Sequence, residues 1–523
     1  MIFTDPAFLF VFLPVFCAIF FLVGHRFGNQ GAIAFLFLAS IICYAPWGAG
    51  ALILLLCSIF INFAIGVALA HGDSPLGEVG KKRIYAIGQI INFAVLIWFK
   101  YQTVQYFLSA MGHQSNVFIM AMIPAGISFY TFHQAAFLAD ARKRDHDVVQ
   151  LVECARSLSA ALLAFARYGA FVSFFPQLII GPITYLKEFY PQVDRKEFGR
   201  FRSLDFSIGL SLVACGLFKK LVLADNLATI STFAFQYSAD QRPMAVSTAV
   251  AGVMGYYAQL YFDFSGYSDM ALGLARMVGL RYPINFFSPL KAVGIIDFYR
   301  RWHMTLTRVV SRFVFTPLSV SGTRKSVRLP KRWRKLISLW IPLLLNFELI
   351  ALWHGATTTF IVFGAIHGLW YITETEVRNR KWFKAWKKRS SDVTRSIIGR
   401  LIFVGPMMLT FALFRSESLT AFYRLCLSLA GIGRTGWHDG TVSVVGYALL
   451  GVSFAIIGLL PNAAELLRNY RPGIMTYVNP ISRGALRLPS WRPTWPWAIG
   501  TGLVALWALY FISRQPPFLY QGF

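Results

Sequence analysis

The sequence predicts an all-α, polytopic integral membrane protein. Of the 523 residues, 56% are hydrophobic and only 14% are charged, whereas soluble globular proteins carry about 25% charged residues. Apolar runs close to the length of a membrane-spanning helix, about 20 residues, recur along the whole chain. Lysine and arginine outnumber aspartate and glutamate by 50 to 23, and they gather between these runs, as in the cytoplasmic loops of membrane proteins.

The apolar runs predict roughly 11–13 transmembrane or re-entrant helices. They cover residues 7–24, 31–48, 50–70, 84–107, 116–139, 158–185, 205–224, 244–275, 337–352, 355–375, 398–415, 442–461 and 494–513. The first run lacks the basic start and the cleavage site of a signal peptide, so we interpret it as a span. The run 158–185 contains Pro176, Gly181 and Pro182 and is expected to be re-entrant. Without an internal repeat or a long linker, residues 1–523 are expected to form one membrane domain.

The basic stretches predict which loops face the cytoplasm. Placing them inside puts both termini outside. The loops expected inside are 71–83, 140–157, 276–336, 376–397 and 462–493. Their expected partners are anionic membrane lipids rather than a nucleic acid, because the cations are dispersed over short loops and form no continuous stripe.

The region 276–336 is too polar to span a membrane but is rich in aromatic residues. Such a composition predicts an amphipathic or re-entrant segment at the cytoplasmic face. A second basic and aromatic stretch, which begins at Arg378, is interpreted as a surface helix whose lysines reach the headgroups.

His354 is the first candidate for chemistry, because ionisable residues at membrane depth are costly and therefore point to function. It follows Trp353 at the junction of two apolar runs that are both short for a full span. A hairpin there would place its turn inside the protein within the membrane. A neutral imidazole at such a place can act as a general base, although position alone leaves a structural role equally open.

His303 is the second candidate, together with Arg300 and Arg301. If this stretch is helical, Arg300 and His303 share a face, and Asp297 can pair with Arg301 four positions on. Two arginines beside a histidine could hold an anionic substrate. Binding of lipid phosphates is the alternative, and the residues alone do not choose between the two.

A third cluster contains two carboxylates at the end of an apolar run. Its members are Asp263, Ser265, Tyr267 and Asp269. Buried carboxylates need partners, and the arginines downstream are the expected ones. A substrate-binding role and a structural ion-pair role both remain open.

Several familiar catalytic motifs are absent from the sequence. There is no P-loop, no GxSxG elbow and no HExxH motif, and the six cysteines show no metal-ligand spacing. We therefore expect no metal site and no bound cofactor. Acyl transfer from an activated thioester fits, because it needs only a base and stabilisation of an oxyanion.

The stretch YFDFSGYSDMALGLARMVGLRYPINFFSPLKAVGIIDFYRRWH, residues 261–303, closely resembles the bacterial branch of the membrane-bound O-acyltransferase superfamily. That branch contains the alginate O-acetyltransferase membrane subunit and the D-alanyl transfer protein of teichoic acid synthesis. Further matches follow in order along the chain. They are PAGISFYTFHQAAFLAD (124–140), FFPQLIIGPI (174–183), GLFKKLVLADNLA (216–228), LWHGATTTFIVFGAIHG (352–368), ALFRSESL (412–419) and the terminal PFLY (517–520).

The resemblance implies a ring of tilted helices pierced by a tunnel, in a bacterial inner membrane. It also implies that the WHG histidine, His354, is catalytic and that the RRWH histidine, His303, is its polar partner. The implied donor is acetyl-CoA, with Arg300 and Arg301 as contacts for its phosphates and the neighbouring Trp353 as a substrate contact. A periplasmic acetyltransferase would then pass the acetyl group to a polysaccharide.

The acceptor remains open, because the segment after His303 departs from the alginate-type pattern. It reads SRFVF (311–315) and SVSGT (319–323), where alginate-type members continue with an aromatic-Arg-Asp-Tyr stretch and a Gly-Gly-Asn turn. Alginate, cellulose and other exopolysaccharides are all compatible with it. The alternatives are a D-alanyl or other acyl transferase that uses a carrier protein, and a transporter without covalent chemistry, although no inverted repeat supports a transporter.

Overall fold

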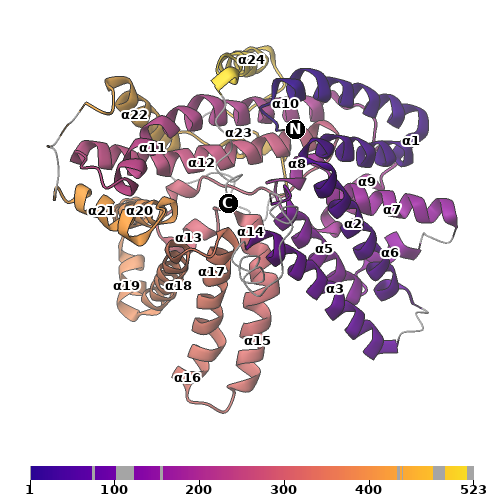
Figure 1. Ribbon diagram of the computed structural model, residues 1–523, viewed down its shortest axis with the longest axis horizontal. Helices are drawn as coiled ribbons and strands as arrows, with labels where there is room; N and C mark the ends of the chain where they lie inside the picture. Colours follow the sequence, from indigo (N-terminus) through magenta and orange to yellow (C-terminus); the bar gives the residue numbers. More distant parts are fainter. Residues whose placement is uncertain are drawn as a thin grey trace, which may run out of the picture. The chain divides into compact units, whose positions relative to one another are not determined.

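The named elements in the described part of the chain are all helices, which confirms the all-α prediction (Figure 1). The computed structural model describes residues 2–72, 77–101, 123–153, 157–432, 436, 438, 440–474 and 489–514. Within these ranges the only strand-like pairing is one isolated bridge, between Pro283 and Ile474. Residues 102–107 and 116–122 of two expected spans, and the terminal match at 517–520, lie outside the described residues.

Six helices among the described residues are long and apolar enough to cross a membrane, so the chain is a multi-pass membrane protein. They are Phe8–Trp47, Ala49–Ala70, Gly77–Lys100, Ser203–Ala239, Lys331–His354 and Asp392–Arg415. The first contains a kink at Gly28, whose φ of 65° is left-handed, so the two runs expected at 7–24 and 31–48 follow each other around this glycine. Other apolar runs form helices too short for a full span, such as Leu158–Ser173 and Val444–Leu459.

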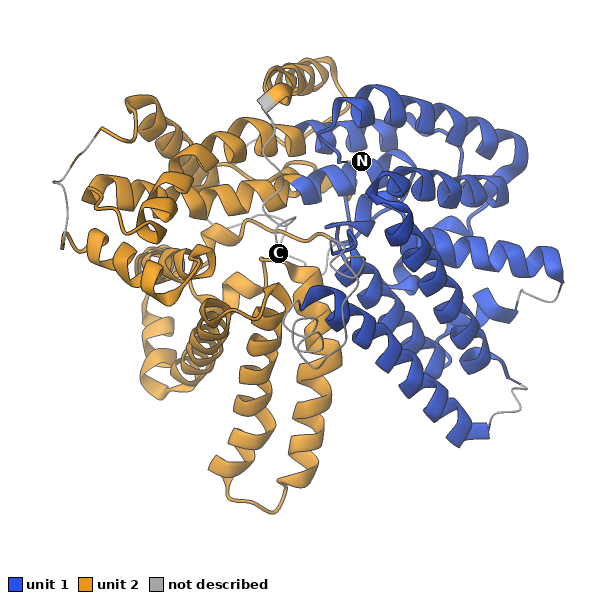
Figure 2. Ribbon diagram, in the orientation of Figure 1, with its two compact units in different colours: residues 1–214, 267–283, 472–475 blue, residues 215–266, 284–471, 476–523 orange. Residues whose placement is uncertain are grey.

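The chain divides into two compact units, which Figure 2 shows in different colours. The first unit comprises residues 1–214, 267–283 and 472–475, and the second comprises 215–266, 284–471 and 476–523. The long helix α12 (Val246–Met277) contributes residues to both units. The expectation of a single membrane domain concerns how the units are joined and stays a prediction.

The first unit is a bundle of apolar helices connected by polar contacts. Its helices are η1 (Phe8–Phe12), α1 (Leu13–Tyr44), η2 (Ala45–Trp47), α2 (Ala49–Ala70), α3 (Gly77–Lys100), α5 (Ile127–Arg142), α6 (His146–Glu153), α7 (Leu158–Ser173), α8 (Phe175–Leu178), α9 (Leu186–Val193) and most of α10 (Ser203–Leu217). Asn62 of α2 donates to Asn92 of α3 and to Gln134 of α5, each over 2.9 Å. Such interhelical hydrogen bonds hold helices together where the lipid gives no hydrophobic driving force.

The run 158–185 is broken, as the prolines and glycine predicted. Helix α7 ends at Ser173, the single turn α8 follows, and residues 179–185 are not helical. Gly181 is required here, because a Cβ would lie 2.3 Å from the Cα of Gln177. This break, which is buried, is the kind of irregular backbone that membrane proteins tolerate only inside the protein.

The second unit carries both candidate histidines. Its elements are η4 (Phe218–Ala224), α11 (Asp225–Ala239), η5 (Pro289–Lys291), α13 (Ile295–Tyr299), α14 (Met304–Val310), η6 (Ser311–Phe315), α15 (Thr316–Lys325), α16 (Lys331–Lys335), η7 (Leu336–Trp340), α17 (Ile341–His354), α18 (Thr358–Asn379), α19 (Lys381–Arg389), α20 (Asp392–Arg415), α21 (Leu419–Leu429), α22 (Val444–Leu459), α23 (Ala463–Leu466), η8 (Arg468–Tyr470), α24 (Trp495–Tyr510) and η9 (Ile512–Arg514). Helices α17 and α18 pack as the expected hairpin, with the turn at residues 355–357.

The region 276–336 contains several short elements rather than one amphipathic helix. Residues 278–294 are mostly irregular, and helices α13 and α14 are separated by the turn 300–303. Helix α15 then runs alongside α16 and η7, which lead into α17. The aromatic residues of this region explain the difference, because Phe286, Phe298 and Trp302 pack against one another in the unit's interior instead of covering a membrane surface.

Candidate active site

His303 and His354 line the same small cavity in the second unit. Its volume is about 30 Å³, enough for one or two water molecules. The lining is Leu260, Tyr299, Trp302, His303, Leu306, Thr307, Ile350, His354, Phe363, Phe411 and Phe414. The sequence identified both histidines, and the structure brings them together in a predominantly apolar site.

His354 is the last residue of α17, and its side chain is buried with 8% of its surface exposed. Its ring meets the ring of Phe414 edge-on at 4.9 Å. The next residue must be small, because a Cβ on Gly355 would lie 2.7 Å from the ring of Phe360. The negative end of the helix dipole favours a cation at this position, so it stabilises the positive charge that the imidazole gains when it accepts a proton.

His303 immediately precedes α14 and has a left-handed backbone, at a φ of 42°. Its Nδ1 lies 3.1 Å from Oδ1 of Asn285, which also accepts hydrogen bonds from the backbone N–H and the hydroxyl of Thr305. Because that amide oxygen only accepts, the proton of His303 resides on Nδ1 and its Nε2 is the basic nitrogen. Burial lowers the pKa of His303 to about 3, so the ring is neutral.

Backbone hydrogen bonds hold His303 in this unusual conformation. The N–H of Phe287 donates to the carbonyl of Arg301 over 2.9 Å, and the N–H of Met304 donates to the carbonyl of Asn285 over 3.0 Å. The segment before α13 is thus bound to the turn after it. Left-handed residues other than glycine persist only where their surroundings impose them, and they concentrate at functional sites.

The ring of Trp353 lies close to both histidine rings. Its ring is 4.7 Å from the ring of His354 and 5.9 Å from that of His303. It is not among the residues that line the cavity. Its position therefore indicates a role in holding both imidazole rings, while the contact with substrate that we expected of it stays a prediction.

Tyr299 and His367 form a hydrogen bond at the edge of the site. The hydroxyl of Tyr299 lies 2.6 Å from Nδ1 of His367, and Tyr299 also lines the cavity. The sequence analysis did not single out His367. The signal that could have found the pair is the presence of two polar rings within otherwise apolar and aromatic runs.

Arg300 and Arg301 line a different cavity from His303, and their expected role in substrate binding stays a prediction. Helix α13 ends at Tyr299, so no continuous helix places Arg300 and His303 on one face. Both arginines line a second, larger cavity of about 750 Å³. The predicted pair is confirmed, because Nε of Arg301 lies 2.9 Å from the carboxylate of Asp297.

The cluster on α12 also differs from the expectation. Asp263 pairs with Lys220 at 2.7 Å, and the same lysine pairs with Asp225 at 2.7 Å, so its cation comes from upstream and is not an arginine. Ser265 is buried in the second unit, whereas Tyr267 and Asp269 are buried in the first. None of these residues lines the histidine cavity, which favours a structural role for the cluster.

Comparisons with known proteins agree with this site. The model of the membrane-bound O-acyltransferase family matches residues 81–391, which include both histidines. A peptidoglycan O-acetyltransferase of Helicobacter pylori is 32% identical, over 83% of this chain and 80% of its own. A probable alginate O-acetylase of Pseudomonas aeruginosa is 31% identical, over 83% and 75%. A teichoic acid D-alanyltransferase of Streptococcus thermophilus is 26% identical, over 47% and 60%.

Proposed function

Because the chain belongs to the membrane-bound O-acyltransferase family, we propose that it moves acetyl groups from cytoplasmic acetyl-CoA across a bacterial inner membrane. The acetyl groups then serve the O-acetylation of an exported polysaccharide through a periplasmic partner protein. The observation that supports the proposal is that His354 and His303 line the same cavity. Two relatives of the chain are named for the acetylation of peptidoglycan and of alginate.

His354 acts as the general base in this proposal. Its imidazole accepts the proton of an acceptor hydroxyl while that oxygen attacks the carbonyl carbon of the acetyl thioester. A C–O bond forms, the C–S bond breaks, and the proton returns from the imidazolium to the departing thiolate. The C-terminal end of α17 stabilises the imidazolium between these two steps.

His303 is the polar partner of this base. Asn285 fixes its tautomer over 3.1 Å, so His303 offers an acceptor nitrogen and carries no charge. The ring packs edge-on against Phe264 at 4.8 Å, which restricts its rotation. We assign His303 a positioning role beside His354, because its ring is neutral and is held in one orientation.

The aromatic surroundings keep water from the thioester. Phe363, Phe411 and Phe414 line the cavity and would surround a substrate that reaches the histidines. Once they close around it, hydrolysis is suppressed and the electrostatic contribution of the histidines increases.

Transfer from a carrier protein is the alternative, and the similarity to a teichoic acid D-alanyltransferase is the observation that favours it. The two readings share His354 and differ in the donor. Purified protein that releases free coenzyme A from labelled acetyl-CoA only when acceptor is added would support the acetyl proposal, and strict dependence on a carrier protein would replace it.

The first test measures polysaccharide acetylation by NMR in cells that lack the native protein. The cells are complemented with wild type, His354→Ala or, as a matched control, His25→Ala, whose side chain is exposed. Membrane expression of each is measured in parallel. We expect wild type and the control to restore acetyl groups and His354→Ala to restore none. Restoration by a well-expressed His354→Ala variant would refute the role of His354 as the base. Failure of wild type to restore acetyl groups would refute the proposal that the protein supplies acetyl groups to this polysaccharide.

A further inference from the structure

The histidine cavity, which His303 and His354 line, holds a base but no cation that would stabilise an oxyanion. When a hydroxyl attacks a thioester, negative charge develops on the carbonyl oxygen, and a hydrogen-bond donor aimed at that oxygen lowers the barrier. Among the described residues that line this cavity there is no lysine or arginine. A donor from the lining is therefore a neutral group.

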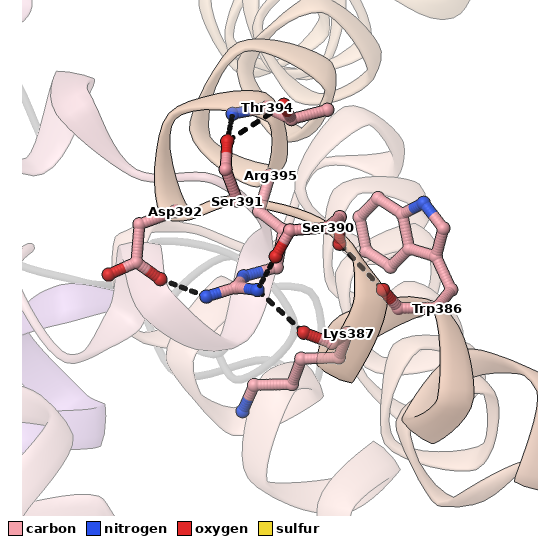
Figure 3. Close-up of polar contacts among 7 residues, drawn as sticks. All are labelled: Trp386, Lys387, Ser390, Ser391, Asp392, Thr394 and Arg395. Carbon is pink, nitrogen blue, oxygen red and sulfur yellow. Dashed lines mark hydrogen bonds and ion pairs between the residues drawn. The ribbon is translucent and has the colours of Figure 1, made fainter.

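The arginine near the start of α20 does not serve this cavity, although α20 supplies Phe411 to its lining. Arg395 donates from Nη1 to the backbone carbonyl of Lys387 over 2.6 Å and also to that of Ser390 (Figure 3). Its Nη2 contacts Asp392. An α-helix rises about 1.5 Å per residue, so Arg395 lies several turns away from Phe411. This cation holds the junction between α19 and α20 together.

Tyr299 offers the hydroxyl that the reaction needs. Two side chains in the lining carry a hydroxyl, those of Tyr299 and Thr307. The hydroxyl of Thr307 donates to the backbone carbonyl of His303 over 3.3 Å, so its hydrogen is used within the first turn of α14. The hydroxyl of Tyr299 lies 2.6 Å from Nδ1 of His367, and the direction of that bond decides whether its hydrogen is available.

The surroundings of His367 decide the direction of this bond. The residue is fully buried, and among the described residues its Nε2 has no hydrogen-bond partner. A neutral imidazole carries one hydrogen, on either Nδ1 or Nε2. Buried N–H groups without an acceptor are rarer in proteins than buried acceptors without a donor, which places the hydrogen on Nδ1. The imidazole therefore donates to the oxygen of Tyr299 and leaves the phenolic hydrogen free.

Both rings of this pair are fixed before a substrate binds. Tyr299 ends α13 and His367 lies within α18. The ring of His367 packs against that of Phe363 at 3.9 Å, and the ring of Tyr299 packs against that of Phe347 at 4.8 Å. A hydroxyl that accepts a hydrogen bond is polarised and becomes a stronger donor. A donor held in this way needs no reorientation at the moment when charge develops.

We propose that Tyr299 is a further catalytic residue, whose hydroxyl donates a hydrogen bond to the carbonyl oxygen of the acetyl thioester, and that His367 is the positioning residue that orients this hydroxyl. The inference rests on the proposed function, because it takes the thioester and the base from it. As the acceptor oxygen attacks, the π electrons of the C=O bond move onto the carbonyl oxygen, and they return when the C–S bond breaks. Tyr299 keeps its proton throughout, so the proton transfers through His354 are unchanged.

The experiment measures the initial rate at which radiolabel passes from acetyl-CoA into polysaccharide. It uses inverted membrane vesicles from cells that lack the native protein and express the full-length variants in measured amounts. The main variant is Tyr299→Phe, which removes the hydroxyl and keeps the ring. We expect its kcat to fall about 100- to 1000-fold, as on removal of one oxyanion donor, and its KM to change little.

Tyr256→Phe is the matched control. Tyr256 is also buried in the second unit, but it lies outside the lining of the histidine cavity. Its hydroxyl has no hydrogen-bond partner among the described residues, so the same change of side chain should leave kcat at the wild-type value.

A second donor distinguishes a catalytic hydroxyl from one that only supports the fold. In acetyldithio-CoA a sulfur atom replaces the carbonyl oxygen, and sulfur is a weak hydrogen-bond acceptor. Tyr299→Phe should therefore slow transfer from this donor by less than about tenfold, while the thermal unfolding midpoint reports damage to the fold. An equal fall in rate with both donors would assign the hydroxyl a structural role and overturn the proposal.

The role of His367 is tested through Tyr299. His367→Leu removes the bond to the hydroxyl and should lower kcat, but it should cause no further fall in a Tyr299→Phe protein, because the effects of coupled residues are not additive. His367→Asn retains an amide N–H close to the position of Nδ1 and should recover much of the rate that His367→Leu loses. Additive losses would show that His367 acts independently of Tyr299 and would overturn its positioning role.

A Tyr299→Phe protein as fast as wild type would overturn this inference and leave the proposed function intact. Wild-type vesicles that transfer label from acetyl-CoA no faster than vesicles without the protein would refute the proposed function, and this inference with it.

Discussion

Asn285 provides the sharpest test of how the site is held together. Its amide oxygen accepts hydrogen bonds from Nδ1 of His303 at 3.1 Å, from the hydroxyl of Thr305 at 2.9 Å and from the backbone N–H of Thr305 at 3.3 Å. Asn285→Leu keeps the branched shape of the side chain and removes the acceptor. A buried donor left without a partner costs about 1–3 kcal/mol, so the loss of all three bonds should cost roughly 3–9 kcal/mol of stability, with the longest bond contributing least.

The effect on catalysis follows from the bond to His303 alone. If losing this hydrogen bond raises the free energy of the transition state by about 1–3 kcal/mol, the rate of acetyl transfer should fall roughly 5- to 150-fold. The assay compares the initial rate per folded protein, with folding measured by the thermal unfolding midpoint in detergent. Thr305→Val is the matched control, because it removes one of the three donors and leaves the bond between Asn285 and His303.

The control should lose about 1 kcal/mol of stability and retain its rate. An Asn285→Leu protein that transfers acetyl groups as fast as wild type, per folded molecule, would show that the amide does not position His303. Equal loss of rate in both variants would show that the rate follows stability and not the orientation of the imidazole.

Two other predictions follow from named contacts. Gly355→Ala should reduce acetyl transfer at unchanged expression, because its Cβ would lie 2.7 Å from the ring of Phe360 and overpacking costs about 1–3 kcal/mol. Gly405→Ala is the control, because Gly405 has open space around it, and its rate should match wild type. Equal rates in the two variants would contradict the steric argument. Lys220→Met should strongly lower the midpoint of thermal unfolding, because the buried carboxylates of Asp225 and Asp263 lose their cation and breaking a buried ion pair costs about 3–5 kcal/mol. An unchanged midpoint would show that these ion pairs do not stabilise the fold.

The class of the protein and its helical pattern could be read from the chain. Apolar runs of spanning length and basic loops predicted a multi-pass helical membrane protein, since lipid offers backbone groups no partners and only helices satisfy them locally. The break after Ser173 and the turn after His354 were also predicted, because proline and glycine act on their own segment. Helix lengths were less predictable, since several apolar runs became short helices within the protein.

Which side chains meet was decided by the tertiary structure. The sequence singled out His303 and His354 because burying an imidazole near membrane depth is costly, but it did not show that Asn285 holds one of them or that Phe414 packs on the other. It assigned the cation of Asp263 to an arginine, whereas Lys220 supplies it. Propensity and periodicity act within a helix, whereas these contacts depend on how separate helices pack against each other.

The turn after α13 shows the same limit most clearly. A continuous helix would have placed Arg300 and His303 on one face, and the sequence contains nothing that forbids it. The helix instead ends at Tyr299, and His303 takes a left-handed backbone that local preference disfavours. Hydrogen bonds to the distant segment 285–287 compensate for that cost. The sequence by itself determined the chemistry-bearing residues, and the tertiary structure divided them between two cavities, because only contacts across the fold can outweigh a local conformational preference.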